Sequence, residues 1–167
     1  VRQKLTDISL SLDTGAYQEP SSLTVAQWLE EWLEVFCINR VKPLTMTSYR
    51  GIVKNHINPR IGAIKVQDVR GVQIQRLYND MLQKGSSPKT IKNVGAVLHK
   101  AFSVARKQGY LQINPCDNAE LPKGERKEIR PLSEADIPLF LHACNGHPMG
   151  NAYALCLLAG LREGECM

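Results

Sequence analysis

The stretch from Ser87 to Gly109 constrains the fold more than any other part of the sequence. Ser87 followed by Pro88 is typical of an N-cap and a first helical position, and Gly109 is typical of the residue that ends a helix. Between them, apolar residues recur on one helix face and polar residues on the other. The apolar face comprises Ile91, Val94, Leu98, Ala101, Phe102 and Ala105, and the polar face comprises Lys89, Lys92, Asn93, Lys100, Ser103 and Lys107. The sequence therefore predicts a long amphipathic helix that packs on a helical core.

Three further helices are predicted before this one, so the expected fold class is all-α. Thr24 is a suitable N-cap for an apolar stripe over Val25 to Cys37. A second helix runs from Pro43 toward Asn58 and is expected to end at Pro59, because proline has no N–H to continue the helical ladder. A third covers Gly71 to Gln83. No stretch alternates clearly between apolar and polar residues as a strand would, and the four helices predict a bundle.

Changes in composition divide the chain into four parts. Residues 1–20 carry apolar positions at helical spacing and are expected to be a helix trailing from an upstream domain. Residues 21–120 are expected to form the four-helix bundle. Residues 121–130 contain Pro, Gly and several cations and are expected to be an interdomain linker. Residues 131–167 include a nearly all-apolar helix over Ala152 to Ala159, which should be buried in a second domain of which only the beginning is present.

The basic residues are unevenly distributed. The net charge of +5 is modest. However, no Asp or Glu occurs between Glu34 and Asp68 or between Asp80 and Asp117, and these two stretches hold 12 of the 21 Lys and Arg residues. A helix that is merely solvated usually mixes charges of both signs to form i,i+4 pairs. A polyanion, double-stranded DNA, is therefore the expected partner.

Candidate DNA-contacting residues lie in three segments. Thr47, Arg50 and Lys54 are spaced by three and four residues and share a face of the second helix. The start of the fourth helix offers backbone N–H groups and polar side chains to a phosphate. Cations of the linker bridge the two domains. The complete set is Thr47, Arg50, Lys54, Ser87, Lys89, Thr90, Lys92, Asn93, Lys100, Lys123, Arg126, Lys127 and Arg130.

Several other classes of function are disfavoured. No apolar run approaches the roughly 20 residues of a membrane helix, and the first residues do not resemble a signal peptide, so we expect a cytoplasmic protein with no membrane partner. The five cysteines are scattered without a Cys-x-x-Cys pair and are expected to be reduced. His142, Cys144 and His147 are close in sequence, but their spacing does not match the usual zinc motifs and a fourth ligand is missing. We expect no metal and no cofactor.

The end of the chain carries a family resemblance. Residues 159–165, Ala-Gly-Leu-Arg-Glu-Gly-Glu, resemble the first catalytic box of the phage integrase family of tyrosine recombinases, whose pattern is Thr-Gly-Leu-Arg-x-x-Glu. The four helices before it resemble the SAM-like core-binding domain of that family. Ala159 stands where the family has threonine, and Cys166 stands where it often has leucine. The likeness covers about Leu23 to Met167, and residues 1–20 resemble the helix that ends an arm-type DNA-binding domain.

The resemblance implies a mechanism for the parent protein. A tyrosine hydroxyl attacks a DNA phosphodiester and forms a 3′-phosphotyrosyl link without metal or nucleotide. Arg162 resembles the first of two arginines that bind the phosphate, and Glu165 would orient it. The alternative is a surface Arg162 that simply pairs with Glu163 or Glu165. The parent would assemble as a tetramer on paired DNA sites.

None of the five tyrosines stands at the place of the family's nucleophile. The family's His-x-x-Arg box, active-site lysine and tyrosine follow further along, so the chain is expected to be an inactive DNA-binding fragment of an integrase that is monomeric off DNA. Two other functions are compatible with the residues. One is a stand-alone helical DNA-binding regulator without catalytic activity. The other is a helical protein-interaction bundle whose lysines only solvate its surface.

Overall fold

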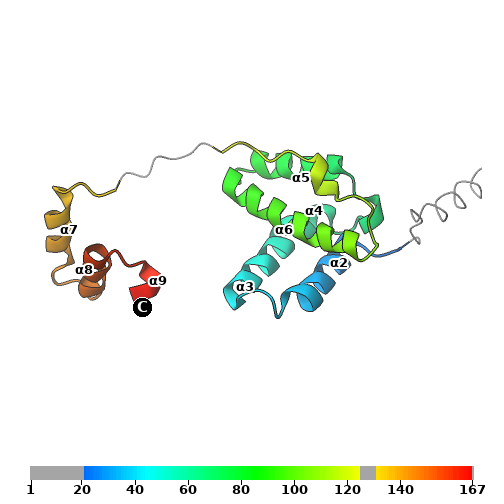
Figure 1. The fold of residues 1–167 in the computed structure, drawn as a ribbon. Helices are drawn as coiled ribbons and strands as arrows, with labels where there is room; N and C mark the ends of the chain where they lie inside the picture. The colour runs from blue at the N-terminus through cyan, green and yellow to red at the C-terminus, as the bar shows by residue number, and fades with distance from the viewer. Residues whose placement is uncertain (1–20, 125–130, 167) are drawn as a thin grey trace, which may run out of the picture. The chain divides into compact units, whose positions relative to one another are not determined.

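The computed structural model describes residues 21–124 and 131–166, which belong to two compact units divided between Gly124 and Glu125 (Figure 1). Each unit is helical, which confirms the expected all-α class; within these ranges the extended pairing is a single antiparallel bridge between Thr24 and Lys65. The trailing helix predicted over residues 1–20 lies outside the described residues. Each helix of the described ranges is too short or too polar to cross a membrane.

The first unit begins with a helix whose start and end match the prediction. Helix α2 (Val25–Glu31) continues directly into the π-helical segment η1 (Trp32–Cys37). Thr24 caps it, because its Oγ1 accepts from the N–H of Gln27 at 3.3 Å while Gln27 Oε1 accepts from the N–H of Thr24 at 3.0 Å. This reciprocal pair satisfies two backbone donors that a helix start otherwise leaves free.

The predicted end of the second helix at Pro59 is wrong. Helix α3 (Pro43–Ile52) runs through the π-helical segment η2 (Val53–Ile57) into α4 (Asn58–Ile61), so the chain stays helical past Pro59. Proline is tolerated in the first turn of a helix because its missing N–H would have no partner there. The wider turn of η2 makes Pro59 part of such a first turn, and the proline redirects the helix without stopping it.

The third and fourth helices have the predicted boundaries. After the short 3-10 turn η3 (Val66–Asp68), helix α5 (Gly71–Gln83) ends at Gly85, and α6 (Pro88–Lys107) ends at Gly109. Both glycines have positive φ, 81° and 82°. At the second, the N–H of Tyr110 donates to the carbonyl of Ala105 at 2.9 Å, the backbone bond of a Schellman turn. The 3-10 turn η4 (Pro115–Asn118) follows.

The core of the first unit is built around Trp28. Its side chain is fully buried, its ring packs against Phe36 and Tyr110 at centroid distances of 6.0 and 5.3 Å, and its Nε1–H donates to the carbonyl of Ala101 at 3.2 Å. The apolar face predicted for α6 is confirmed, because all six of its residues are buried. In Figure 1, α6 passes close to α2 and α3. Helix α6 therefore shields much of the apolar surface of the unit.

The second unit contains α7 (Asp136–Cys144), α8 (Gly150–Ala159) and α9 (Glu163–Cys166). Among the described residues of this unit Gly150 alone is buried, and Leu155 and Leu158 of α8 are 52% and 72% exposed, so burial of the apolar helix in a second domain stays a prediction. Three short helices do not present enough surface to cover an all-round apolar helix.

Candidate nucleic-acid interface

The first turn of α6 is set by its cap. Ser87 Oγ accepts from the N–H of Thr90 at 3.1 Å and lies 2.9 Å from the hydroxyl of Thr90. Pro88 has no N–H, and the N–H of Ile91 donates to the carbonyl of Ser87 at 3.1 Å. The free N–H groups expected at this helix start are thus mostly occupied, which leaves the backbone of Lys89 as the donor of this turn that points toward solvent. A phosphate here would depend on side-chain cations more than on the backbone.

The polar side of α6 lies opposite its buried face. Lys89, Lys92, Asn93, Lys100 and Lys107 are exposed, while Ser103 is half-buried. The helix contains no acidic residue over its 20 positions. These cations therefore have no carboxylate on their own helix to neutralise them, and their field extends into solvent.

Lys100 connects this side of α6 to α3. Its Nζ donates to the hydroxyl of Tyr49 at 2.9 Å and lies 5.6 Å from the centre of the Tyr49 ring. The Tyr49 ring stacks on Trp32 with centroids 5.7 Å apart and an interplanar angle of 19°. Lys100 thus helps to hold α6 against α3, and it also contributes positive charge to this side of α6.

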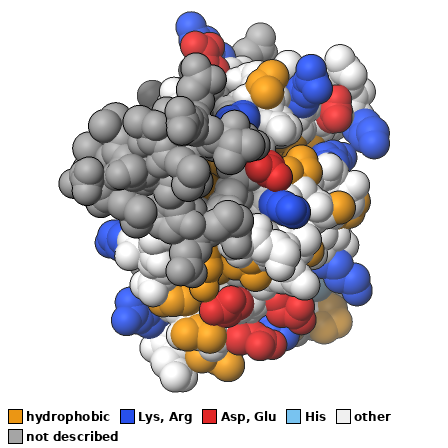
Figure 2. Space-filling model, turned by 90° about the vertical axis from the view of Figure 1, so that its right-hand side faces the viewer, with side chains coloured by type: hydrophobic (Ala, Val, Ile, Leu, Met, Phe, Trp, Pro, Cys, Tyr) orange, Lys and Arg blue, Asp and Glu red, His pale blue; other side chains and the backbone are white. Residues whose placement is uncertain are grey.

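The candidates on α3 and η2 lie in a different setting. Arg50 and Lys54 line a groove whose other wall, on α2 and η1, includes Glu30 and Glu34. Thr47, one turn earlier, donates its hydroxyl to the carbonyl of Pro43 at 3.2 Å. Figure 2 shows a face of the molecule on which acidic side chains gather beside hydrophobic ones, with Lys and Arg side chains around them. A stretch of sequence without Asp or Glu can therefore still face carboxylates in the folded chain. Here α2 and η1 bring Glu30 and Glu34 to the groove that Arg50 and Lys54 line.

The chain that leaves the bundle is fixed against α6. Asn114 is buried; its Nδ2 donates to the carbonyl of His99 at 3.0 Å and to Ser103 Oγ at 2.9 Å, and its Oδ1 accepts from the N–H of Cys116 at 3.0 Å. His99 Nε2 lies 3.0 Å from a carboxylate oxygen of Asp117. An Asn-Pro pair is typical of a turn start, so the sequence indicates the turn here, but the contacts of Asn114 with α6 depend on the tertiary structure.

Of the linker candidates, Lys123 is described and exposed. Arg126, Lys127 and Arg130 lie outside the described residues. Near Lys123, a Cβ at Gly124 would lie 3.2 Å from the Cβ of Pro88, so this part of the chain runs beside the start of α6. The structure thus brings the backbone beside Lys123 to the start of α6, the turn that carries Lys89.

Arg162 and Glu165 lie together in the second unit. Helix α8 ends at Gly160 with φ 65°, and the N–H of Leu161 donates to the carbonyl of Cys156 at 3.0 Å, which turns the chain into α9. Glu165 accepts from the backbone N–H of Arg162 at 2.9 Å, and its other oxygen lies 3.6 Å from the guanidinium. The Arg162 side chain is 89% exposed. Its guanidinium therefore still has donors for an anion, and Glu165 restrains its position.

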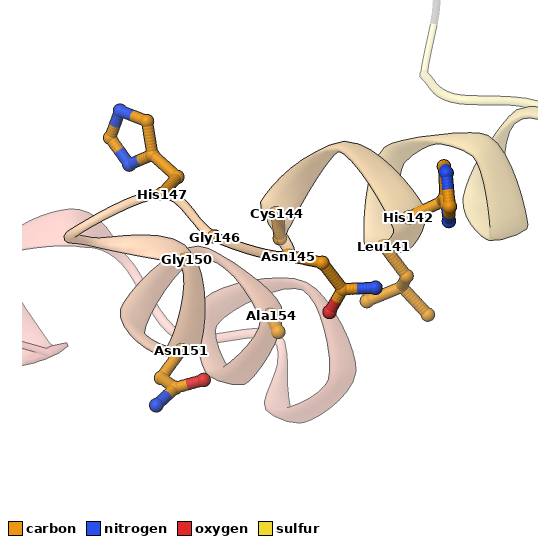
Figure 3. Close-up of a pocket in the computed structure, with 9 residues that line it drawn as sticks. All are labelled: Leu141, His142, Cys144, Asn145, Gly146, His147, Gly150, Asn151 and Ala154. Atoms are coloured by element: carbon orange, nitrogen blue, oxygen red, sulfur yellow. The ribbon is translucent and has the colours of Figure 1, made fainter.

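The three close residues His142, Cys144 and His147 line one hollow between α7 and α8 without converging. Figure 3 shows the two imidazole rings pointing away from each other. His147 Nδ1 accepts from the N–H of Met149 at 3.1 Å, and its ring packs on Tyr153 at 5.4 Å, so it supports the start of α8. Within the described ranges, no group of three His, Cys, Asp or Glu side chains could hold a metal ion.

Comparisons with known proteins agree with this arrangement. A family model described as phage integrase, N-terminal SAM-like domain, matches residues 24–82. A tyrosine recombinase XerC-like protein of Caldanaerobacter subterraneus subsp. tengcongensis is 33% identical over 153 residues, which are 87% of this chain and 39% of that protein. The chain therefore spans about two fifths of the length of this relative.

Two solved structures are also similar. The phage integrase SAM-like domain from Moorella thermoacetica is 34% identical with a TM-score of 0.55, and the match covers 68% of this chain and 97% of that one. A lambda integrase dimer bound to a COC' core site has a TM-score of 0.73 at 20% identity, over 84% of this chain and 51% of that one, and shows the shared fold. This chain therefore belongs to the phage integrase family of tyrosine recombinases and carries its SAM-like domain, whose model matches the part from Thr24 into α5.

Proposed function

We propose that this chain is a DNA-binding part of a site-specific tyrosine recombinase, and that the exposed cationic side of α6 contacts the phosphates of duplex DNA. The observation that supports it most strongly is α6 itself, with one face buried and an acid-free opposite face. Phosphate neutralisation by Lys and Arg releases counterions and provides most of the sequence-independent affinity for DNA.

The residues fall into two groups within this proposal. Lys89, Lys92 and Asn93 project from one end of α6 and, with Lys123 nearby, make a compact set of phosphate contacts; the hydroxyls of Ser87 and Thr90 stay in the cap. Arg50 and Lys54 approach DNA from the edge of the bundle, where Glu30 and Glu34 weaken their field. We expect the first group to contribute more affinity, because each of its cations acts without a carboxylate across the groove.

The second unit would contribute a catalytic group. Arg162, held by Glu165, binds the non-bridging oxygens of the attacked phosphate in the recombination reaction, since a guanidinium can hold two oxygens at once. The four described tyrosines have packing roles: Tyr78 is buried in the core, Tyr49 lies under Lys100, Tyr110 lies against Trp28 and Tyr153 lies against His147. The proposal therefore has this chain bind DNA without forming a phosphotyrosyl bond, with integration and assembly on paired sites belonging to the whole recombinase.

Charge reversal tests the proposed surface. Lys89→Glu with Lys92→Glu should weaken duplex binding strongly and lower the dependence of log K on log salt by about 0.9 per lost phosphate contact. Lys65→Glu with Arg76→Glu is the matched control, because it reverses two exposed cations outside the surface and changes the net charge equally. Lys100 is left intact because it also holds Tyr49. Equal losses in both double variants would contradict a localised interface, and unchanged binding in both would favour a protein-interaction bundle.

The stability of the second unit distinguishes the recombinase part from the alternative, a stand-alone helical regulator. A regulator complete in itself would need residues 131–166 as a stable part of its fold. Limited proteolysis followed by mass spectrometry should remove this part first and leave residues 21–124 intact with their DNA affinity. Retention of the second unit under conditions that degrade the first would support the regulator.

A further inference from the structure

The segment from Ala119 to Gly124 lies along the seam between α5 and α6. Gln75 of α5 forms two hydrogen bonds to the backbone of Glu120 in this segment. The N–H of Glu120 donates to Gln75 Oε1 at 2.7 Å, and Gln75 Nε2 donates to the carbonyl of Glu120 at 3.2 Å. The same Nε2 donates to Asn79 Oδ1 at 3.2 Å, which orients the amide. A side chain that pairs with both backbone groups of one residue fixes that residue as a neighbouring strand would.

Three close approaches hold the rest of the segment. Side-chain atoms at Gly71, Gly95 and Gly124 would collide with or touch the facing chain. A Cβ at Gly95 would lie 2.9 Å from Leu121 Cδ2, one at Gly71 would lie 2.8 Å from the Cβ of Asn118, and one at Gly124 would lie 3.2 Å from the Cβ of Pro88. Glycine lets the backbone of Asn118 approach at Gly71, and it leaves room for the Leu121 and Pro88 side chains at Gly95 and Gly124. The chain therefore runs from η4 back to the start of α6, with Leu121 seated over Gly95.

This path places a cation of the segment beside the cations of α6. Pro88, Lys92 and Gly95 are four and three residues apart, so they share one edge of the helix, and the segment passes Gly95 and then Pro88. Lys123 lies between these two contacts in the chain and is exposed, so its backbone runs beside the first two turns of α6, which carry Lys89 and Lys92. Of the acids on the segment and η4, Asp117 lies 3.0 Å from His99, and Glu120 is exposed, with its backbone bonded to Gln75.

We propose that Gln75 is a positioning residue for DNA binding: by holding the backbone of Glu120 it docks the segment and keeps Lys123 within the cationic surface of α6. This inference rests on the proposed function of that surface. Gln75 itself makes no contact with DNA in this scheme; it acts through Lys123.

A double-mutant cycle on the whole chain tests this role with Gln75→Leu, Lys123→Ala and their combination, measured by duplex binding over a range of salt concentrations. Lys123→Ala should lower the salt slope by about 0.9, the value for one phosphate contact. Gln75→Leu should lower it by a similar amount, and the combined variant should be no weaker than Lys123→Ala alone. Gln83→Leu, an exposed glutamine at the other end of α5, is the control and should leave the slope unchanged.

Hydrogen exchange of residues 120–124 provides the second readout. The amide of Glu120, which donates to Gln75 Oε1, should exchange slowly in the unchanged chain and quickly in Gln75→Leu, with α5 and α6 still protected. Leu121→Ser, which removes the apolar anchor without altering a helix, should have the same two effects. Normal DNA affinity in Gln75→Leu, or strictly additive losses in the cycle, would overturn the inference while the proposed function stands. Failure of the unchanged chain to bind duplex DNA would overturn both.

Discussion

The two units of this chain enclose their apolar residues to different extents. In the first, the large apolar side chains of α2, α5 and α6 are enclosed, and Trp28, Leu98 and Phe102 are each fully buried. In the second, α8 is more uniformly apolar than any of these helices, yet Leu158 is 72% exposed. Apolar content therefore does not determine burial. A helix is buried only when enough neighbouring surface from other elements can be brought against it.

The physical difference is amphipathicity. The helices of the first unit each present one apolar stripe, so a few of them close a core and leave a polar outside. Helix α8 is apolar all round and needs partners on every side, whereas α7 and α9 are short. The first unit should accordingly unfold cooperatively, and the second should contribute little to the free energy of unfolding.

The largest expected effect tests that contrast directly. Trp28→Ala should destabilise the first unit by about 3–5 kcal/mol, because it leaves a cavity at the centre of the core. Leu158→Ala in the second unit should cost less than about 0.5 kcal/mol, as surface substitutions generally do. Chemical denaturation followed by circular dichroism measures both. Similar losses of stability for the two variants would contradict the contrast. The loss for Trp28→Phe should fall between them, because phenylalanine keeps most of the packing but loses the hydrogen bond to the carbonyl of Ala101.

The pH dependence of stability should also differ between the two units, because the first unit buries cysteine thiols. Burial, with a smaller contribution from Asp117, raises the pKa of Cys116 to about 12, and burial also raises the pKa of Cys37. An unfolded thiol ionises near pH ~8.5, so raising the pH favours the unfolded state, and the stability conferred by the neutral thiol is lost progressively above that pH, by up to about 1.4 kcal/mol per pH unit per group.

Urea unfolding at pH 7.5 and pH 10 measures this loss. Cys116→Ser should reduce the difference between the two pH values, whereas Cys166→Ser, in the second unit, should leave it unchanged. If the stability of the first unit were the same at both pH values, the Cys116 thiol would not be shielded as the structure shows it.

The helix ends allow a finer comparison. Gly109 and Gly160 both have positive φ and both end a helix with the same type of backbone bond. Alanine at either place costs roughly 1–2 kcal/mol locally, because a Cβ is crowded in the left-handed conformation. Gly109→Ala should lower the global unfolding midpoint, whereas Gly160→Ala should be visible only as faster hydrogen exchange at the end of α8. A global loss from Gly160→Ala would show that the second unit unfolds together with the first.

The smallest effect is a stabilisation. Gly51 lies within the continuous helix of α3 and η2, and a Cβ there would meet nothing within 4 Å. Gly51→Ala should therefore raise the free energy of unfolding by about 0.5–1 kcal/mol, since glycine loses more backbone freedom than alanine on folding. Gly62→Ala is the contrasting control, because its Cβ would lie 2.5 Å from the carbonyl oxygen of Asn58. Destabilisation by Gly51→Ala would indicate that α3 is constrained by contacts on that side.

Several elements could be predicted because their determinants are local. Thr24, Ser87 and Gly109 define helix ends through bonds to residues a few positions away, so caps and boundaries follow from the sequence. Pro59 was misjudged because a π turn before it changed its position within the helix. The pairing of Arg162 with Glu165 was also accessible, since three residues separate them along one turn.

The candidate interface was only partly predictable, because some of its features are local to one helix and others depend on contacts between distant segments. The face of α6 that carries Lys89 and Lys92 is a property of one helix and follows from its period. The neighbourhood of Arg50 and Lys54 depends on α2, and the place of Glu120 depends on Gln75, which is 45 residues away from it. Spacing along one helix contains no information on these contacts.

The sequence by itself determined the all-helical class, the limits of α5 and α6, the buried and cationic sides of α6, and the family, because caps, helical period and a short motif act within a few residues. The tertiary structure alone decided which charges face each other, which apolar helix stays uncovered and where the chain leaves the bundle. These features depend on surfaces that meet only when distant segments pack. The free energy of such a contact depends on both elements that form it, so neither segment's sequence determines it alone.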